Sequence, residues 1–149
     1  SAAAEVGPII AYAGDGPRKA LSSYGLNLGL AFQLIDDALD YGGTAADLGK
    51  NVGDDFREGK ITMPLLLSYR RGSEDERAFW KSSIEQGNND DEALQKAIGL
   101  MTKHGSIADT VQRARHFGEI ARDALAPLPQ TPQKDALIDV IDFCISRVN

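Results

Sequence analysis

The sequence has one cysteine, Cys144, among its 149 residues. A single thiol cannot form an internal disulfide, and it cannot supply the several thiols of a structural zinc site. This favours a reducing compartment, so we expect a cytoplasmic protein. Long apolar runs are also missing, because no stretch approaches the ~20 apolar residues of a membrane-spanning helix. The first residues lack the basic start of a signal peptide. We therefore expect no transmembrane segment.

Positive charge is scarce as well. Lysine and arginine number 16 against 22 aspartate and glutamate residues, which gives a net charge of −6. Nonspecific binding of nucleic acid requires a basic surface, so the composition argues against nucleic acid as a partner. The same acidity means that a phosphate ligand would need a bound cation to bridge it to the protein.

The alternation of apolar and polar residues that marks β-strands is absent from every window of the sequence. Helical patterns are separated instead by glycine, proline and capping residues, such as the capping box of Ser73 and Glu76. We predict an all-α fold, an antiparallel helical bundle with short connections, in one domain. The expected helices cover about residues 1–13, 17–41, 62–72, 73–87, 90–105, 106–127 and 131–148, and residues 42–60 are expected to form a loop.

The beginning of the sequence, Ser1 to Val6, has the composition of a helix interior and carries no clear start signal. We therefore expect that a segment upstream of Ser1 belongs to the same protein.

A narrow acidic strip is predicted on the helix that ends near Tyr41. At 100° per residue, Gln33, Asp36, Asp37 and Asp40 fall within an arc of roughly 100°. The other positions are apolar all the way round, whereas a surface helix has a wide polar face. The sequence thus predicts carboxylates on a helix that is otherwise buried.

Carboxylates that are partly buried together need a positive partner, since burying an unpaired charge costs several kcal/mol. A bound metal or nearby lysines could provide it, and a set of oxygen ligands suits Mg²⁺. The alternative is a helix with a solvent-facing acidic edge and ordinary lysine pairs. The following loop favours the metal, because Lys50 and Lys60 each adjoin a glycine. Glycine lets the backbone approach an anion closely, and lysine is a compact charge for phosphate.

The two segments FQLIDDALD and LGKNVGDDFREGKITMPLL together resemble the second aspartate-rich region of the trans-isoprenyl diphosphate synthases. The resemblance is close from Gly25 to Leu67, and later residues match in helical character only. The amino-acid sequence of the loop is most similar to that of long-chain synthases of the octaprenyl to decaprenyl type. The resemblance implies that residues 1–149 are the C-terminal half of a polyprenyl synthase domain, with the second aspartate-rich motif at 36–40.

The resemblance also implies an activity, the condensation of isopentenyl diphosphate with an allylic diphosphate in the presence of Mg²⁺. Asp36 matches a magnesium ligand, and Asp37 and Asp40 match acidic residues that complete or support the metal site. Lys50 and Lys60 match lysines that approach the allylic diphosphate in a catalytic and substrate-binding role. The pair that matches residues lining the reaction cavity is Phe32 and Gln33.

The family's first aspartate-rich motif and its upstream basic segment do not occur in this sequence. We expect the isolated chain to be inactive and to associate, either as a homodimer or with the missing N-terminal half. An alternative function is that of a noncatalytic subunit of a heteromeric synthase, although such subunits usually lose the acidic motif or the lysines. A terpene cyclase and a plain structural bundle are disfavoured by the LGK…GDD…GK run.

Several other residues have ordinary structural interpretations. Asp54 and Asp55 could join the metal site, but pairing with Lys60 or Arg57, or capping a turn, is the favoured interpretation. His104 suits a helix C-terminus, where a cation is stabilised. Core packing is expected for Trp80 and Cys144. Arg147 lies where some family members have a basic residue that touches diphosphate.

Overall fold

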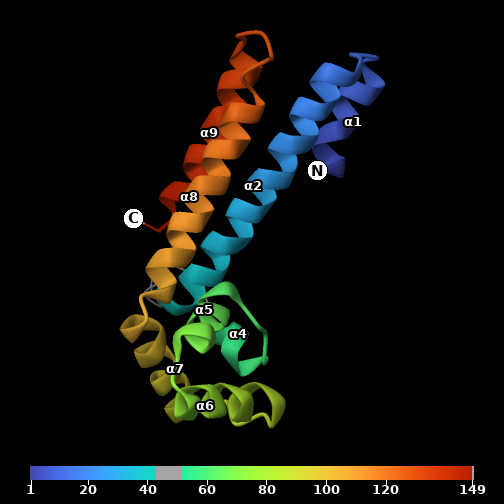
Figure 1. Ribbon diagram of the computed structural model, residues 1–149. Helices are drawn as coiled ribbons and strands as arrows, with labels where there is room; N and C mark the ends of the chain where they lie inside the picture. The colour runs from blue at the N-terminus through green and yellow to red at the C-terminus, as the bar shows by residue number, and fades with distance from the viewer. Residues whose placement is uncertain (43–51, 149) are drawn as a thin grey trace. The chain divides into compact units, whose positions relative to one another are not determined.

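The structure is a computed structural model that describes residues 1–42 and 52–148. It divides into two compact units, which are described separately. Unit 1 comprises Ser1–Ile35 and Gln112–Asn149, and unit 2 comprises Asp36–Val111. The described residues form helices and no strand, which confirms the all-α prediction (Figure 1). The helices are α1 (Ala2–Ile10), α2 (Asp15–Gly42), α4 (Asp54–Arg57), α5 (Met63–Arg71), α6 (Glu74–Glu85), α7 (Asp91–Lys103), α8 (Ser106–Ala124) and α9 (Pro132–Ser146).

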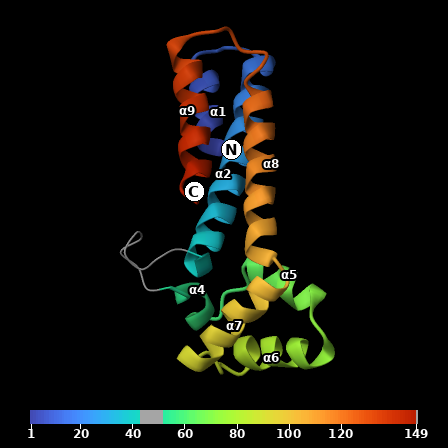
Figure 2. The same cartoon turned by 90° about the vertical axis from the view of Figure 1, so that its left-hand side faces the viewer.

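Unit 1 is a set of helices packed around one apolar cluster. Tyr24 from α2, Ala121 from α8 and Ile141 from α9 are buried in it, together with Leu125. In the view of Figure 2, α1 and α2 are seen between α9 and α8. The last helix begins as the sequence predicts, because Thr131 caps it by accepting a hydrogen bond from the N–H of Lys134 at 3.3 Å.

Unit 1 keeps several large apolar side chains in contact with solvent. Leu26, Leu30 and Phe32 on α2 have exposed fractions of 53%, 40% and 49%. Similar side chains on α1 and α9 are also exposed, namely Val6, Ile9, Ile10, Val140 and Phe143. Exposed apolar residues in such number are typical of surfaces that pack against other protein.

Unit 2 has its own core, in which the rings of Phe56 and Trp80 meet edge to face with centroids 6.3 Å apart. The core is completed by Leu65 of α5, by Leu94, Ala97 and Met101 of α7, and by Tyr41 of α2. Burial of Trp80 here, and of Cys144 in unit 1, confirms the packing roles predicted for both residues.

Local signals place the starts of two helices of unit 2 correctly. The hydroxyl of Ser73 accepts from the N–H of Glu76, whose carboxylate in turn accepts from the N–H of Ser73. Asp90 caps α7 by accepting from the N–H of Ala93 at 2.9 Å. The short helix α4 is a difference, because the sequence predicted a continuous loop there. None of the helices in residues 1–42 and 52–148 is long and apolar enough to cross a membrane.

Candidate functional site

The acidic strip lies in the part of α2 that belongs to unit 2. Asp37 is buried, with 7% of its surface exposed, and Asp36 and Asp40 are half-buried. Ala38 and Tyr41 beside them are buried, as predicted, but the expectation that the rest of this helix is buried fails at Leu30 and Phe32, which are 40% and 49% exposed. Carboxylates in such surroundings need hydrogen-bond donors, and the structure shows where two of them find donors.

Asp40 is joined to the start of α4. Its Oδ2 accepts a hydrogen bond from the N–H of Asp55 at 3.2 Å, and its backbone oxygen accepts from the N–H of Gly53 at 2.8 Å. Burial raises the pKa of the Asp40 carboxyl to about 6. The negative charges of Asp55 and Asp54 add to this increase, while the bonds from their backbone N–H groups oppose it. Asp40 therefore lies where a positive charge would favour its ionised form.

Asp37 is joined to the start of α5. Its Oδ2 accepts from the N–H of Met63, the first residue of that helix, at 3.4 Å. The hydroxyl of Thr62, just before α5, donates to the phenol oxygen of Tyr41 at 3.4 Å. Burial raises the pKa of Tyr41, so this phenol stays protonated. The sequence predicted that Tyr41 is buried, but it did not predict this hydrogen bond from Thr62.

Lys60 lies between α4 and α5, directly after Gly59, whose φ of +70° is a conformation that favours glycine. The ammonium group is 2.8 Å from Asp55 Oδ1 and 2.7 Å from Glu58 Oε2, and the side chain is 55% exposed. The hydrogen bonds to these two carboxylates raise the pKa of Lys60, so it is charged at neutral pH.

The pairing predicted for the two neighbouring aspartates is confirmed. Asp55 pairs with Lys60, and Asp54 lies 3.6 Å from the guanidinium of Arg57. Lys50, the other predicted lysine, lies outside the described residues. Within unit 2, Asp40 and Lys60 thus both contact Asp55, and Asp37 contacts Met63, three residues after Lys60.

Phe32 and Gln33 belong to unit 1, and both are exposed. The guanidinium carbon of Arg147, which follows the last residue of α9, lies 5.2 Å from the centroid of the Phe32 ring. This distance is within the range of a cation–π interaction. Arg147, a weak candidate in the sequence, is therefore a neighbour of a predicted cavity residue.

His104 ends α7, as predicted, but its role differs from that of a simple helix terminus. Its Nε2 lies 3.0 Å from Glu76 Oε2, and Lys103 contacts the other oxygen of the same carboxylate at 2.6 Å. These contacts and the N–H of Ser73 lower the pKa of Glu76 to about 2. Glu76, Lys103 and His104 thus join α6 to α7. None of the three is a predicted site residue.

The oxygen atoms of the strip fit Mg²⁺ chemically, because this ion prefers carboxylate, phosphate and water oxygens. Across the described ranges, no three His, Cys, Asp or Glu side chains are grouped so as to hold an ion by themselves. Magnesium sites commonly use one or two carboxylates and complete the shell with substrate phosphates and water. The strip therefore fits a site that a diphosphate would complete.

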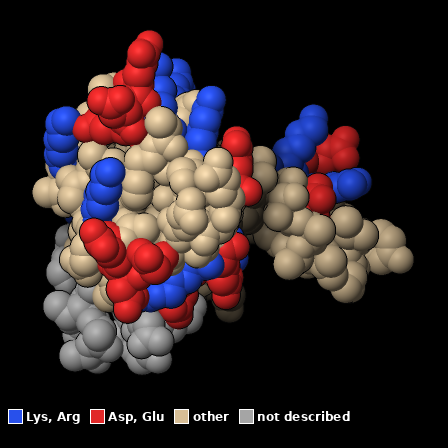
Figure 3. All heavy atoms as spheres, turned by 90° about the horizontal axis from the view of Figure 1, so that it is seen from below, with Lys and Arg blue, Asp and Glu red and all other residues tan. Residues whose placement is uncertain are grey.

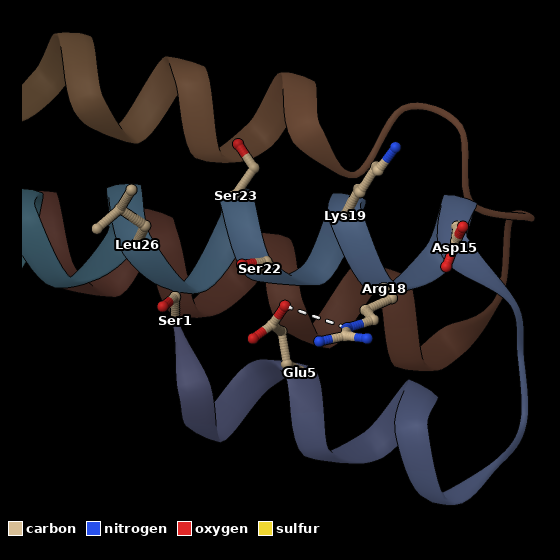
Figure 4. A pocket seen from close by; sticks show the side chains of 8 residues that line it. All are labelled: Ser1, Glu5, Asp15, Arg18, Lys19, Ser22, Ser23 and Leu26. Atoms are coloured by element: carbon tan, nitrogen blue, oxygen red, sulfur yellow. Dashed lines mark hydrogen bonds and ion pairs between the residues drawn. The ribbon is translucent and has the colours of Figure 1, made fainter.

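A hollow of about 500 Å³ opens in unit 1 between α1 and the beginning of α2 (Figure 4). Charges of both signs line it, and Arg18 Nε lies 3.4 Å from Glu5 Oε1 across it. Acidic and basic side chains are likewise interleaved on the surface shown in Figure 3. Neither feature gathers charge of one sign as an anion site would, and no predicted site residue lines the hollow.

Comparisons with a family profile, with protein sequences and with solved structures all indicate the same family. The profile of the polyprenyl synthetase family matches residues 1–101. The chain is 41% identical over 145 residues to the octaprenyl diphosphate synthase of Haemophilus influenzae, covering 97% of the chain and 44% of that relative. It superposes with a TM-score of 0.89 on the decaprenyl diphosphate synthase of Rhodobacter capsulatus, at 48% identity over 97% of the chain and 45% of that structure.

A polyprenyl synthase from Caulobacter crescentus, solved in complex with calcium and isoprenyl diphosphate, is also similar. The TM-score is 0.87 and the identity 43%, over 97% of the chain and 44% of that structure. The similarity extends well past Leu67, where the sequence alone showed only helical character. The chain spans less than half the length of each of these relatives.

Proposed function

Because the chain belongs to the polyprenyl synthetase family, we propose that the protein it forms part of condenses isopentenyl diphosphate with an allylic diphosphate. The product is a polyprenyl diphosphate, and inorganic diphosphate leaves. The observation that carries this proposal is the set of contacts joining the acidic strip of α2 to the segment with Lys60, in a chain 41% identical to an octaprenyl diphosphate synthase.

The reaction breaks the allylic carbon–oxygen bond, so that the diphosphate leaves with the bonding electrons. The alkene of isopentenyl diphosphate then attacks the allylic carbon, and loss of a proton from the adduct restores a double bond. Negative charge grows on the departing diphosphate. A fixed positive group beside it stabilises the transition state electrostatically.

In this chain, Asp36 would hold Mg²⁺, while Asp37 and Asp40 complete or support the site. When bound, the ion would offset the charge of the diphosphate. Lys60 carries a positive charge on a side chain that is 55% exposed, so an anion can reach it. We assign Lys50 the same role by resemblance. Phe32 and Gln33 would line the cavity beside the allylic chain, where apolar walls exclude water from a carbocation.

We further propose that the complete protein works in the cytoplasm as a homodimer. Support for the compartment comes from the single cysteine, Cys144, which is free and buried. Support for association comes from the exposed apolar side chains of unit 1.

The test uses a complete synthase that contains this chain. Purified protein is incubated with an allylic diphosphate and radiolabelled isopentenyl diphosphate, with Mg²⁺ or with a chelator, and the extracted products are sized by chromatography. We expect labelled polyprenyl products with Mg²⁺ and none with the chelator. If product forms only after a second synthase subunit is added, the noncatalytic alternative is correct.

A further inference from the structure

The helices α4 and α5 begin without a capping side chain of their own. The residue before α4 is Gly53, which has no side chain, and it adopts φ +82°. The residue before α5 is Thr62, whose hydroxyl makes no capping bond and donates to Tyr41. The first N–H groups of a helix have no partner within it, so each start needs acceptors from elsewhere.

Those acceptors come from α2. Asp40 accepts from the N–H of Asp55, the second residue of α4, and Asp37 accepts from the N–H of Met63, the first residue of α5. Asp37 and Asp40 are three residues apart, so they lie on one face of the helix. Aspartate is among the strongest capping residues, and here a different helix supplies it.

The segment between these two helix starts contains Lys60. After α4 ends at Arg57, Glu58 to Thr62 connect to α5, with the left-handed Gly59 directly before Lys60. A bond to α2 therefore lies on each side of the lysine. The ion pairs of Lys60 with Asp55 and Glu58 are exposed, and exposed pairs contribute little to stability. The backbone hydrogen bonds to Asp37 and Asp40 are therefore the better candidates for fixing the position of the Lys60 backbone.

We propose that Asp37 and Asp40 are positioning residues that cap α5 and α4 from α2 and so hold the Lys60 segment at both ends. Direct metal binding within the strip then falls to Asp36. This inference rests on the proposed function for what Lys60 does, but the caps themselves do not depend on it.

Substitution by asparagine separates the two roles. Asparagine keeps an oxygen that can accept the N–H bond and is itself a good cap, but it lacks the charge of a magnesium ligand. Alanine removes both. The experiment therefore compares Asp37→Asn, Asp40→Asn, Asp37→Ala and Asp40→Ala in the complete synthase, with Asp36→Asn as the metal-ligand control.

The first readout is hydrogen exchange measured by mass spectrometry without Mg²⁺ or substrates. In Asp40→Ala we expect the amides at the start of α4 to exchange about tenfold faster, and in Asp37→Ala those at the start of α5, because a cap is lost. The asparagine variants should retain most of the wild-type protection. Equal protection in the wild type and both alanine variants would overturn the inference even if the protein proves to have no prenyl transfer activity.

The second readout is kinetic. Asp37→Asn and Asp40→Asn should keep the wild-type Mg²⁺ concentration for half-maximal rate, whereas Asp36→Asn should raise it about tenfold or more. The alanine variants should raise KM for the allylic diphosphate with less change in KM for isopentenyl diphosphate. An increase in the Mg²⁺ requirement of Asp37→Asn or Asp40→Asn as large as that of Asp36→Asn would show a ligand role instead. A wild-type enzyme without product would count against the proposed function alone.

Discussion

At the scale of single residues, Asp36 is the carboxylate on which the proposed chemistry most depends. It is half-buried on the face of α2 that also carries Asp37 and Asp40. In the complete enzyme, Asp36→Ala should lower turnover by about a hundredfold or more, because electrostatic support of the leaving group is lost. Steady-state assays at saturating Mg²⁺ measure this, with Asp75→Ala in the exposed first turn of α6 as the control. Near-normal turnover of Asp36→Ala would show that Asp36 is not part of the metal site.

Lys60 gives a prediction about substrate selectivity. Lys60→Ala, and likewise Lys50→Ala, should weaken the binding or ionisation of the allylic diphosphate by about tenfold or more, since a charge-assisted contact is removed. The KM for isopentenyl diphosphate should change less. Initial rates with each substrate varied in turn measure both effects. Lys81→Ala, on the exposed side of α6, is the matched control. Equal losses for the two substrates would show that these lysines do not belong to the allylic site.

At the scale of elements, Glu76 joins the start of α6 to the end of α7. Because the folded protein lowers its pKa from 4.5 to about 2, its contribution to stability is present above the unfolded pKa. The contribution is lost as the pH falls from about 4.5 toward 2. Glu76→Gln should therefore lower the free energy of unfolding at pH 7, and the difference from wild type should narrow at pH 3.

Urea unfolding at several pH values measures this difference. Glu74→Gln, two residues earlier at an exposed position, is the control and should show little change. A constant difference between wild type and Glu76→Gln from pH 7 to pH 3 would contradict the role of the charge.

Gly53 gives the second prediction at this scale. A Cβ added there would lie 2.3 Å from Leu94 Cδ1 and 3.1 Å from its Cγ, and φ is +82°. Gly53→Ala should lower the free energy of unfolding by about 2 kcal/mol or more, from backbone strain and overpacking together. Gly99→Ala in α7 is the matched control, because nothing lies within 4 Å of the added Cβ. It should stabilise the protein by about 0.5–1 kcal/mol. Urea unfolding, monitored by circular dichroism, measures the free energy of unfolding of both variants and of the wild type.

Helix starts show how far the sequence could predict this fold. Ser73, Asp90 and Thr131 cap their own helices, so the signal lies within four residues and was readable. The helix α4 was missed because it has four residues and receives its capping acceptor from Asp40, fifteen positions before Asp55. The same limit applies to the site. The helical wheel predicted a strip of carboxylates, but the backbone amides that two of them bind could only be found in three dimensions.

At the scale of the whole molecule, the relevant fact is that the chain spans less than half the length of its relatives. The exposed apolar side chains of α1, α2 and α9 favour association. We expect the isolated 149-residue chain to form a dimer, or a complex with the N-terminal half of the enzyme. We also expect no product from the chain alone, because it has only one of the family's two aspartate-rich motifs.

Light scattering on the purified chain measures its mass against the 16.0 kDa of one copy, and an assay with both diphosphates and Mg²⁺ measures activity. Refolding the chain with the N-terminal half should restore some activity. A monomer that makes product unaided would contradict both expectations.

Under the proposed function, the ion pairs of Lys60 have a consequence for how salt affects the binding of a diphosphate. Since its ammonium group already contacts Asp55 and Glu58, a diphosphate that reaches Lys60 exchanges one set of anionic partners for another. In an exchange of this kind, dissolved ions screen the contacts that are lost as well as those that are gained. The lysine's share of substrate affinity should therefore depend only weakly on ionic strength. Removing the competing carboxylates would tighten binding in dilute buffer and make it more sensitive to added salt.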